Sequence, residues 1–149
     1  MPRLIIRLAA AALFAGIALS GVPAGAEDTV EVPAADTIEV VLDASGSMKA
    51  KMDDGNSRFD AARLAVLIML EKLPQTSSVA LRVYGHQSTP DQKNCDDTEL
   101  VADFGSGEEH LGGIRRKVAD LQSLGYTPIS VSLQKAAADL AGQGEGQKT

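Results

Sequence analysis

The chain has 149 residues, 20 acidic and 14 basic side chains and a formal net charge of −6. This length suffices for one domain, and with 3% aromatic residues the core must be aliphatic. Because an acidic chain repels phosphate backbones, the charge argues against a nucleic-acid-binding protein.

The first 26 residues have the pattern of a secretory signal peptide. Arg3 and Arg7 precede an apolar run over residues 8–19, and small residues follow up to Ala26, where we expect cleavage. A membrane anchor is the alternative, but it requires an apolar run of about 20 residues. We therefore expect an exported protein, periplasmic or extracellular, with residues 27–36 as a linker and no membrane span in the mature part.

The mature sequence contains three predicted strands and three predicted helices. Short apolar or alternating runs indicate strands at residues 37–42, 78–84 and 99–104. Apolar side chains at helical spacing indicate helices at residues 58–73, 108–124 and 128–141. Their order predicts an α/β domain of the doubly wound (Rossmann-like) class, with a mostly parallel sheet and helices on both faces. The third strand is expected at an edge, because it is short and flanked by acids.

Local signals predict how two of the helices begin. Ser57 with Asp60 three residues later indicates a capping box at the start of the first helix. That helix should be deeply packed, because residues 64–70 are apolar on almost every side. Thr127 before Pro128 is typical of an N-cap followed by the first helical residue, so Thr127 should cap the last helix.

The motif with the clearest chemistry is Asp43-Ala44-Ser45-Gly46-Ser47, directly after the first strand. Its acid and two hydroxyls stand at alternate positions, so a tight turn can bring their oxygens to one point. Open α/β folds build their sites at this carboxyl end of the sheet. One carboxylate with neutral hydroxyls suits a hard divalent cation such as Mg²⁺. The hydroxyl of Thr127 keeps a lone pair for a cation even when it caps a helix.

With these residues the chain resembles the von Willebrand factor type A (VWA) domain, and in particular its exported bacterial members. The first motif matches the family's D-x-S-x-S segment, and Thr127 within Gly-x-Thr-Pro-Ile matches its later threonine. Further stretches that look like the exported bacterial type are Tyr84-Gly85-His86 and Cys95-x-Asp97-x-Glu99. The resemblance covers about residues 37–141. It implies a metal-ion-dependent adhesion site (MIDAS).

In that site, the resemblance implies that Mg²⁺ or Mn²⁺ is bound by Asp43, Ser45, Ser47 and Thr127. It also implies a sheet of six strands and an Asp after the fourth strand. The sequence ends before the fourth strand and before this Asp. The fourth strand would lie beside the first, so a chain that ends at Thr149 would leave an unpaired apolar edge. We therefore expect residues 37–149 to be the N-terminal part of a VWA domain, truncated before its fourth strand.

Cys95 is the single cysteine. In an exported protein an odd cysteine suggests a partner elsewhere, a reactive thiol or an inert one. The resemblance implies that its disulfide partner lies in the missing segment. Of the two histidines, we expect His86 in a structural hydrogen bond at the rim and His110 at the surface. The acids of residues 96–99 could attract cations, but we interpret them as ordinary acids of a polar loop.

The resemblance implies a non-enzymatic module that binds an acidic side chain of a protein partner through the metal, in adhesion or as a scaffold. A hydrolase or phosphoryl-transfer enzyme has less support. No G-x-S-x-G motif is present, and Ser45 stands where a D-x-D pattern would have its second acid. The remaining alternative is a poorly folding fragment that binds nothing.

Overall fold

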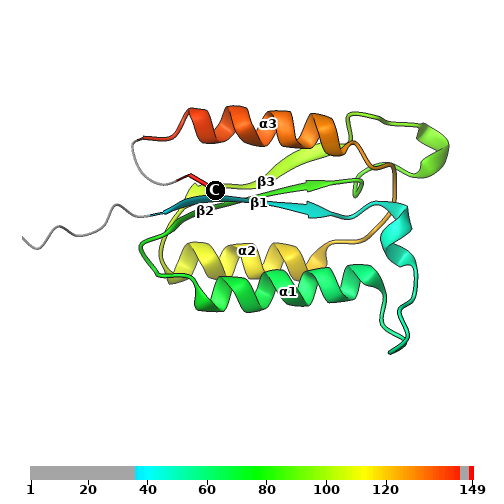
Figure 1. Cartoon of the computed structure of the whole chain (residues 1–149), viewed down its shortest axis with the longest axis horizontal. Coiled ribbons are helices and arrows are strands. Elements are labelled where there is room, and N and C mark those ends of the chain that lie inside the picture. The colour runs from blue at the N-terminus through cyan, green and yellow to red at the C-terminus, as the bar shows by residue number, and fades with distance from the viewer. Residues whose placement is uncertain (1–35, 145–147) are drawn as a thin grey trace, which may run out of the picture. The chain divides into compact units, whose positions relative to one another are not determined.

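The computed structural model describes residues 36–144 and 148–149, so the predicted signal peptide and nearly all of the predicted linker lie outside the described residues. The described strands are β1 (Thr37–Asp43), β2 (Ser78–Tyr84) and β3 (Thr98–Gly105). The described α-helices are α1 (Arg58–Lys72), α2 (Glu108–Asp120) and α3 (Ile129–Ala141) (Figure 1). Two short 3₁₀-helices, Gly46–Lys49 and Pro90–Gln92, lie in the connections.

The sheet has the order β1-β2-β3. β1 and β2 are parallel and in register from Thr37 opposite Ser78 to Asp43 opposite Tyr84. The predicted α/β class and the edge position of β3 are both confirmed. β3 pairs antiparallel with β2, and its register shifts near Leu81. Because β1 and β2 run in the same direction, their last residues, Asp43 and Tyr84, lie together at the carboxyl end of the sheet.

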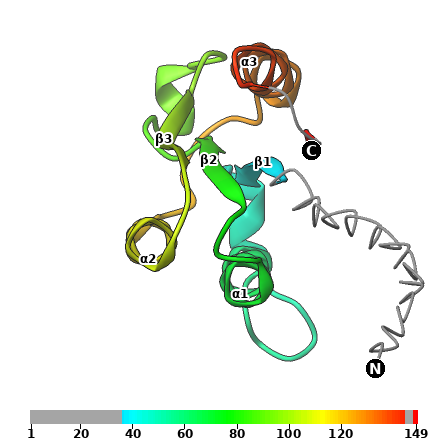
Figure 2. The same ribbon diagram turned by 90° about the vertical axis from the view of Figure 1, so that its left-hand side faces the viewer.

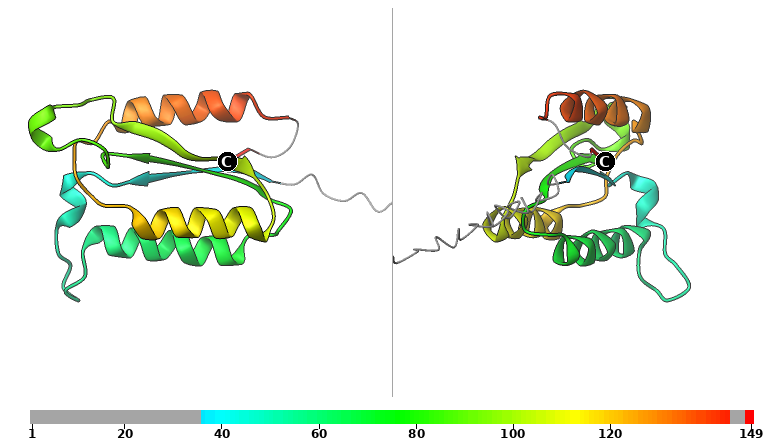
Figure 3. Two further views of the ribbon diagram at one scale, coloured as in Figure 1. Left: turned by 180° about the vertical axis from the view of Figure 1, so that it is seen from behind. Right: turned by 60° about the vertical axis from the view of Figure 1, so that its left-hand side comes forward.

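Helices cover both faces of the sheet, as predicted. α1 and α2 lie on one face and α3 lies on the other (Figure 2), and the view from behind shows the same two layers (Figure 3). The core lies between the sheet and the α1–α2 layer. Its fully buried members include Leu70, Leu81, Val83, Ile114 and Val118.

The expectation of deep packing for α1 is wrong on one side of the helix. Phe59, Val66 and Leu70 are buried, but Leu64 is 58% exposed and Ile68 is 42% exposed. The other side of α1 faces the sheet and α2. In the described part of the chain, no element covers Leu64 and Ile68.

The predicted capping box is confirmed at the start of α1. The Asp60 amide donates to Ser57 Oγ at 3.0 Å, and the Ser57 amide donates to Asp60 Oδ2 at 3.1 Å. The cap predicted at Thr127 is wrong: Pro128 is the N-cap residue, and no side chain caps α3. Pro128 has ψ 55°, which is outside the helical region, so the helix begins one residue later than expected.

The outer edge of β1 is partly paired. Lys148 forms a parallel bridge with Thr37, the Thr149 amide donates to Thr37 O at 2.8 Å, and the Glu39 amide donates to Thr149 O at 2.8 Å. Beyond Glu39, no described residue pairs with this edge. The described sheet thus contains three of the six strands that the resemblance implies. Among residues 36–144, no helix is long and apolar enough to cross a bilayer.

Candidate functional site

The turn after β1 brings its acid and two hydroxyls together. The Ser45 amide donates to Asp43 Oδ1 at 2.7 Å, and Ser45 Oγ lies 3.1 Å from Ser47 Oγ. Ser45 is fully buried, Asp43 is half-buried and Ser47 is exposed. The group therefore reaches the surface at the carboxyl end of the sheet.

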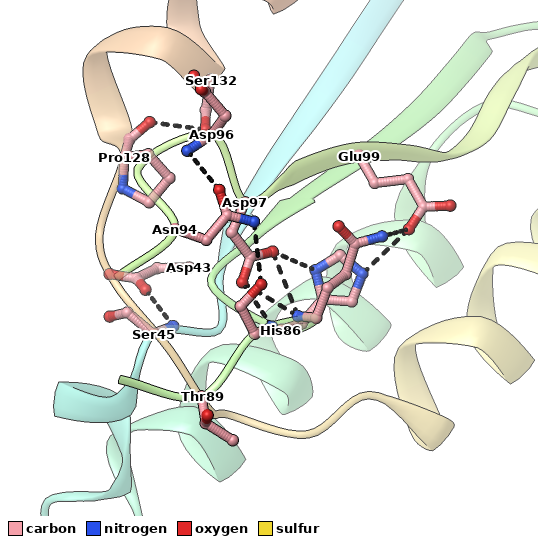
Figure 4. A network of polar contacts seen from close by, with 12 residues as sticks. Asp43, Ser45, His86, Thr89, Asn94, Asp96, Asp97, Glu99, Pro128 and Ser132 are labelled. Atoms are coloured by element: carbon pink, nitrogen blue, oxygen red, sulfur yellow. Dashed lines mark hydrogen bonds and ion pairs between the residues drawn. The ribbon is translucent and has the colours of Figure 1, made fainter. Parts of the chain in front are cut away.

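A second loop, residues 121–128, packs directly against this turn. The Leu124 amide donates to Ala44 O at 2.9 Å, and the Gly46 amide donates to Gly125 O at 2.8 Å. Figure 4 shows Asp43 and Ser45 beside the segment that leads to Pro128. Thr127 lies in this segment, two residues after Gly125. Its side chain is exposed and does not cap α3.

Glycines allow the loops of the site to approach so closely. Gly85, which follows β2, has φ +72°, and a Cβ there would lie 2.8 Å from Ser45 Cα and closer still to Tyr126 O. A Cβ at Gly125 would overlap Ser88 O. Backbone atoms cannot move away as a flexible side chain can, so both positions require glycine.

Asp97 lies in the loop before β3, as predicted, but it is not an ordinary exposed loop acid. The residue is fully buried, and its carboxylate accepts hydrogen bonds from the amides of Gln87 at 3.2 Å and Ser88 at 2.9 Å. It thereby holds the loop after β2, whose Ser88 carbonyl contacts Gly125. Apart from the Cys-x-Asp-x-Glu pattern, nothing in the sequence distinguishes Asp97 from the exposed Asp96 beside it.

His86 makes the hydrogen bond expected of a structural residue. Its Nε2 lies 3.3 Å from Glu99 Oε2, and its Nδ1 lies 3.9 Å from Asp97 Oδ1 (Figure 4). His110 was expected at the surface but is half-buried, since its Nε2–H donates to Val79 O at 2.8 Å and its ring packs on Gly105. Cys95 is exposed and free.

At the carboxyl end of the sheet, the Tyr84 phenol is uncharged beside the Asp43 carboxylate. Burial, and then the neighbouring Asp43 carboxylate, raise the pKa of Tyr84 far above its usual value, so the phenol stays neutral. In the described part of the chain, no group of three His, Cys, Asp or Glu side chains could hold a metal. The donors available at the turn are instead one carboxylate and hydroxyls. This all-oxygen set fits Mg²⁺ or Mn²⁺, which need few protein charges.

Two curated proteins of Bacillus subtilis (strain 168) resemble the chain. YwmC is 30% identical over 110 residues, which are 71% of this chain and 47% of YwmC. YwmD is 32% identical over 104 residues, which are 66% of this chain and 45% of YwmD. The chain thus spans about half the length of these relatives.

The fold is similar to that of solved structures of the pilus adhesin SpaC from Lactobacillus rhamnosus GG. One crystal structure matches with a TM-score of 0.60 and 24% identity, covering 80% of this chain and 15% of SpaC. The open conformation of SpaC matches with a TM-score of 0.57 and 23% identity, covering 80% of this chain and 14% of SpaC. At this identity the likeness concerns the fold. The family profile for the von Willebrand factor type A domain matches residues 38–149, and the chain therefore belongs to this family.

Proposed function

We propose that the chain is a metal-ion-dependent protein-binding module. Asp43, Ser45, Ser47 and Thr127 would hold Mg²⁺ or Mn²⁺, and a protein partner would add a carboxylate. The observation that carries this proposal is the 3.1 Å separation of the Ser45 and Ser47 hydroxyls beside the Asp43 carboxylate. A bound divalent cation would supply an electrophilic position for the partner's acid.

The residues of the turn have distinct tasks in this proposal. The Ser45 amide fixes the Asp43 carboxylate by binding Oδ1 at 2.7 Å, which leaves Oδ2 for the cation. The serine and threonine hydroxyls are neutral, so they leave most of a cation's charge uncompensated and attractive to a partner carboxylate. Gly85, Gly125 and Asp97 hold the surrounding loops in place, so little ordering is needed on binding.

Several observations support an exported, non-enzymatic module of the adhesion or scaffold class. The family and the pilus adhesins with the same fold support adhesion. The signal-peptide pattern of residues 1–26 supports export, to the periplasm or outside the cell. No observation on the described residues specifically favours a hydrolase.

Metal binding can be tested without knowing the partner. We expect Asp43→Asn to weaken Mn²⁺ binding at least about tenfold, because it removes the carboxylate from the donor set. Binding is measured by the electron paramagnetic resonance of free Mn²⁺, with Mg²⁺ as a competitor. Thr127→Ala should weaken Mn²⁺ binding in the same direction.

The matched control is Asp53→Asn, which makes the same charge change at an exposed position of the loop before α1. Its Mn²⁺ affinity should equal that of the wild type, and circular dichroism should show the same fold for all variants. Equal Mn²⁺ affinity in the wild type and Asp43→Asn would refute the metal site.

A further inference from the structure

A basic pocket of about 340 Å³ adjoins the candidate metal site. Its walls come from the 3₁₀-helix Gly46–Lys49 and the loop after it, the first turns of α1, and residues 121–123. Three of the side chains that line it are cationic, namely Lys49, Lys51 and Arg63, and one is acidic, namely Asp60. Such a concentration of positive charge contrasts with the net charge of −6 of the whole chain.

The acid in the pocket is hydrogen-bonded within the capping box, and two of the pocket's cations form no ion pair with a described residue. Asp60 accepts hydrogen bonds from the amide and the hydroxyl of Ser57, in the capping box of α1. Lys49 and Lys51 are exposed, and neither side chain forms an ion pair with another described residue. The pocket therefore offers ammonium groups to an outside anion.

Arg63 is held in a fixed orientation at the same pocket. Its guanidinium lies 5.6 Å from the centroid of the Phe59 ring, a cation–π contact, and Nη1 donates to Leu121 O at 3.4 Å. Phe59 is buried and anchors this arrangement. The remaining N–H groups of Arg63 can bind a carboxylate, for which a planar guanidinium is well suited.

The pocket and the candidate metal site share their loops. Ser47 and Lys49 belong to the same 3₁₀-helix, two residues apart. On the other wall, Ser123 donates a hydrogen bond to the Ser45 carbonyl through its hydroxyl, and Ser123 also lines the pocket. The pocket is therefore built on the same two segments of the chain as the candidate metal site.

We propose that this pocket binds a second carboxylate of the protein partner, so that the partner presents an acidic peptide segment rather than a single acid. The inference rests on the proposed function, since the first carboxylate is the one expected at the metal. Charge complementarity of this kind raises the rate of association and selects among partners, and added salt weakens it.

The test compares two short, fluorescein-labelled Gly-Ser peptides, one with a single Glu and one with a run of Glu. Fluorescence anisotropy measures their binding to the full chain in Mg²⁺ and in EDTA. We expect the acidic peptide to bind the wild type about threefold to tenfold more tightly than the single-Glu peptide. In the double variant Lys49→Gln/Lys51→Gln this ratio should fall toward one, with Arg63 as the pocket's remaining cation.

The matched control is Lys72→Gln/Lys135→Gln, which removes two exposed cations from the far end of α1 and from α3. It should keep the wild-type ratio. Two results would overturn the second contact: a wild-type ratio of one, or a ratio in Lys49→Gln/Lys51→Gln that equals the wild-type ratio. Displacement of the acidic peptide by inorganic phosphate, beyond that by NaCl at equal ionic strength, would assign the pocket to free anions and overturn the peptide contact. If EDTA leaves the affinity for the single-Glu peptide unchanged, the proposed function itself is overturned.

Discussion

Gly85 lies where the loops of the candidate site meet. A comparison with Gly55 separates the effect of this close packing on stability from the effect of a positive φ alone. Gly85 has φ +72°, and its missing side chain makes room for the backbone of Ser45 and Tyr126. Gly55 has φ +84°, but no heavy atom lies within 4 Å of the position of its Cβ. The two glycines share a left-handed backbone and differ in their surroundings.

We expect Gly85→Ala to lower the free energy of unfolding by about 3 kcal/mol or more, because backbone overlap adds to the left-handed strain. Gly55→Ala should cost about 1 kcal/mol, from the strain alone. Urea denaturation of both variants measures the difference. Equal losses would mean that the loops can separate at Gly85 at little cost.

Glu39 is a buried carboxyl on β1 with an incomplete set of partners. Its Oε1 accepts a hydrogen bond from Arg82 Nε at 2.9 Å, but its Oε2 is buried without a hydrogen-bond partner. Burial is the main cause that raises the pKa of Glu39 above its ordinary value of 4.5, and Arg82 opposes this shift. The folded chain therefore binds the Glu39 proton more tightly than the unfolded chain does.

This difference has a defined sign in the pH dependence of stability. The stability that the proton contributes is complete below pH 4.5 and is lost as the pH rises through the higher, folded pKa of Glu39. Glu39→Gln can still accept a hydrogen bond from Arg82 and cannot ionise. The free energy of unfolding of Glu39→Gln minus that of the wild type should therefore increase with pH.

Urea denaturation at about pH 4 and about pH 8 measures this difference. Glu71→Gln, at an exposed position of α1, serves as the control for a general charge effect. A difference that stays constant or shrinks with rising pH would contradict the assignment to Glu39.

At the scale of the elements, Arg82 connects three of them. It lies on β2, bonds Glu39 on β1 through Nε, and forms an ion pair with Asp139 on α3 through Nη2. Arg82 is 4% exposed and the Glu39 side chain is fully buried, whereas Asp139 is partly exposed, so the Glu39 pair is the one that lies away from water. Few other buried side chains hold α3 to the sheet: Ser132 and Ala136 are its fully buried residues.

We expect Arg82→Ala to lower the free energy of unfolding by about 3–5 kcal/mol, because two carboxylates would remain without their cation. Amide hydrogen exchange should show a greater loss of protection in α3 than in α2. Arg58→Ala, at the exposed start of α1, should cost less than about 0.5 kcal/mol. Equal protection losses in α2 and α3 would contradict the role of Arg82 in holding α3.

Most features set by neighbouring residues could be predicted from the sequence, although the cap predicted at Thr127 is wrong, and several contacts between distant residues could not be predicted. The bounds of β2 and the capping box of α1 follow from local patterns and agree with the structure. The burial of Asp97 and the contact of His110 with Val79 depend on segments far apart in the chain. The contact between the turn after β1 and the loop that contains Thr127 likewise rests on backbone hydrogen bonds between distant segments, Leu124 to Ala44 and Gly46 to Gly125.

Over the described residues, polar sites and exposed apolar side chains occupy different parts of the surface. One end of the described sheet carries the candidate metal site and the basic pocket. Elsewhere apolar side chains are open to water: Leu64 and Ile68 on α1, and Ile129 and Leu133 on α3. Along the outer edge of β1, only residues up to Glu39 have a described strand partner. Open strand edges and exposed apolar side chains both promote association.

We therefore expect the chain to self-associate with rising concentration. The double variant Leu64→Lys/Ile68→Glu should reduce this association with little change in the free energy of unfolding, since neither side chain is buried. Sedimentation velocity over a concentration series measures it. Ser130→Lys/Gln134→Glu adds the same charges at exposed positions of α3 without removing apolar surface, so it should associate like the wild type. If the α1 variant also associates like the wild type, then the uncovered side of α1 does not drive the contact.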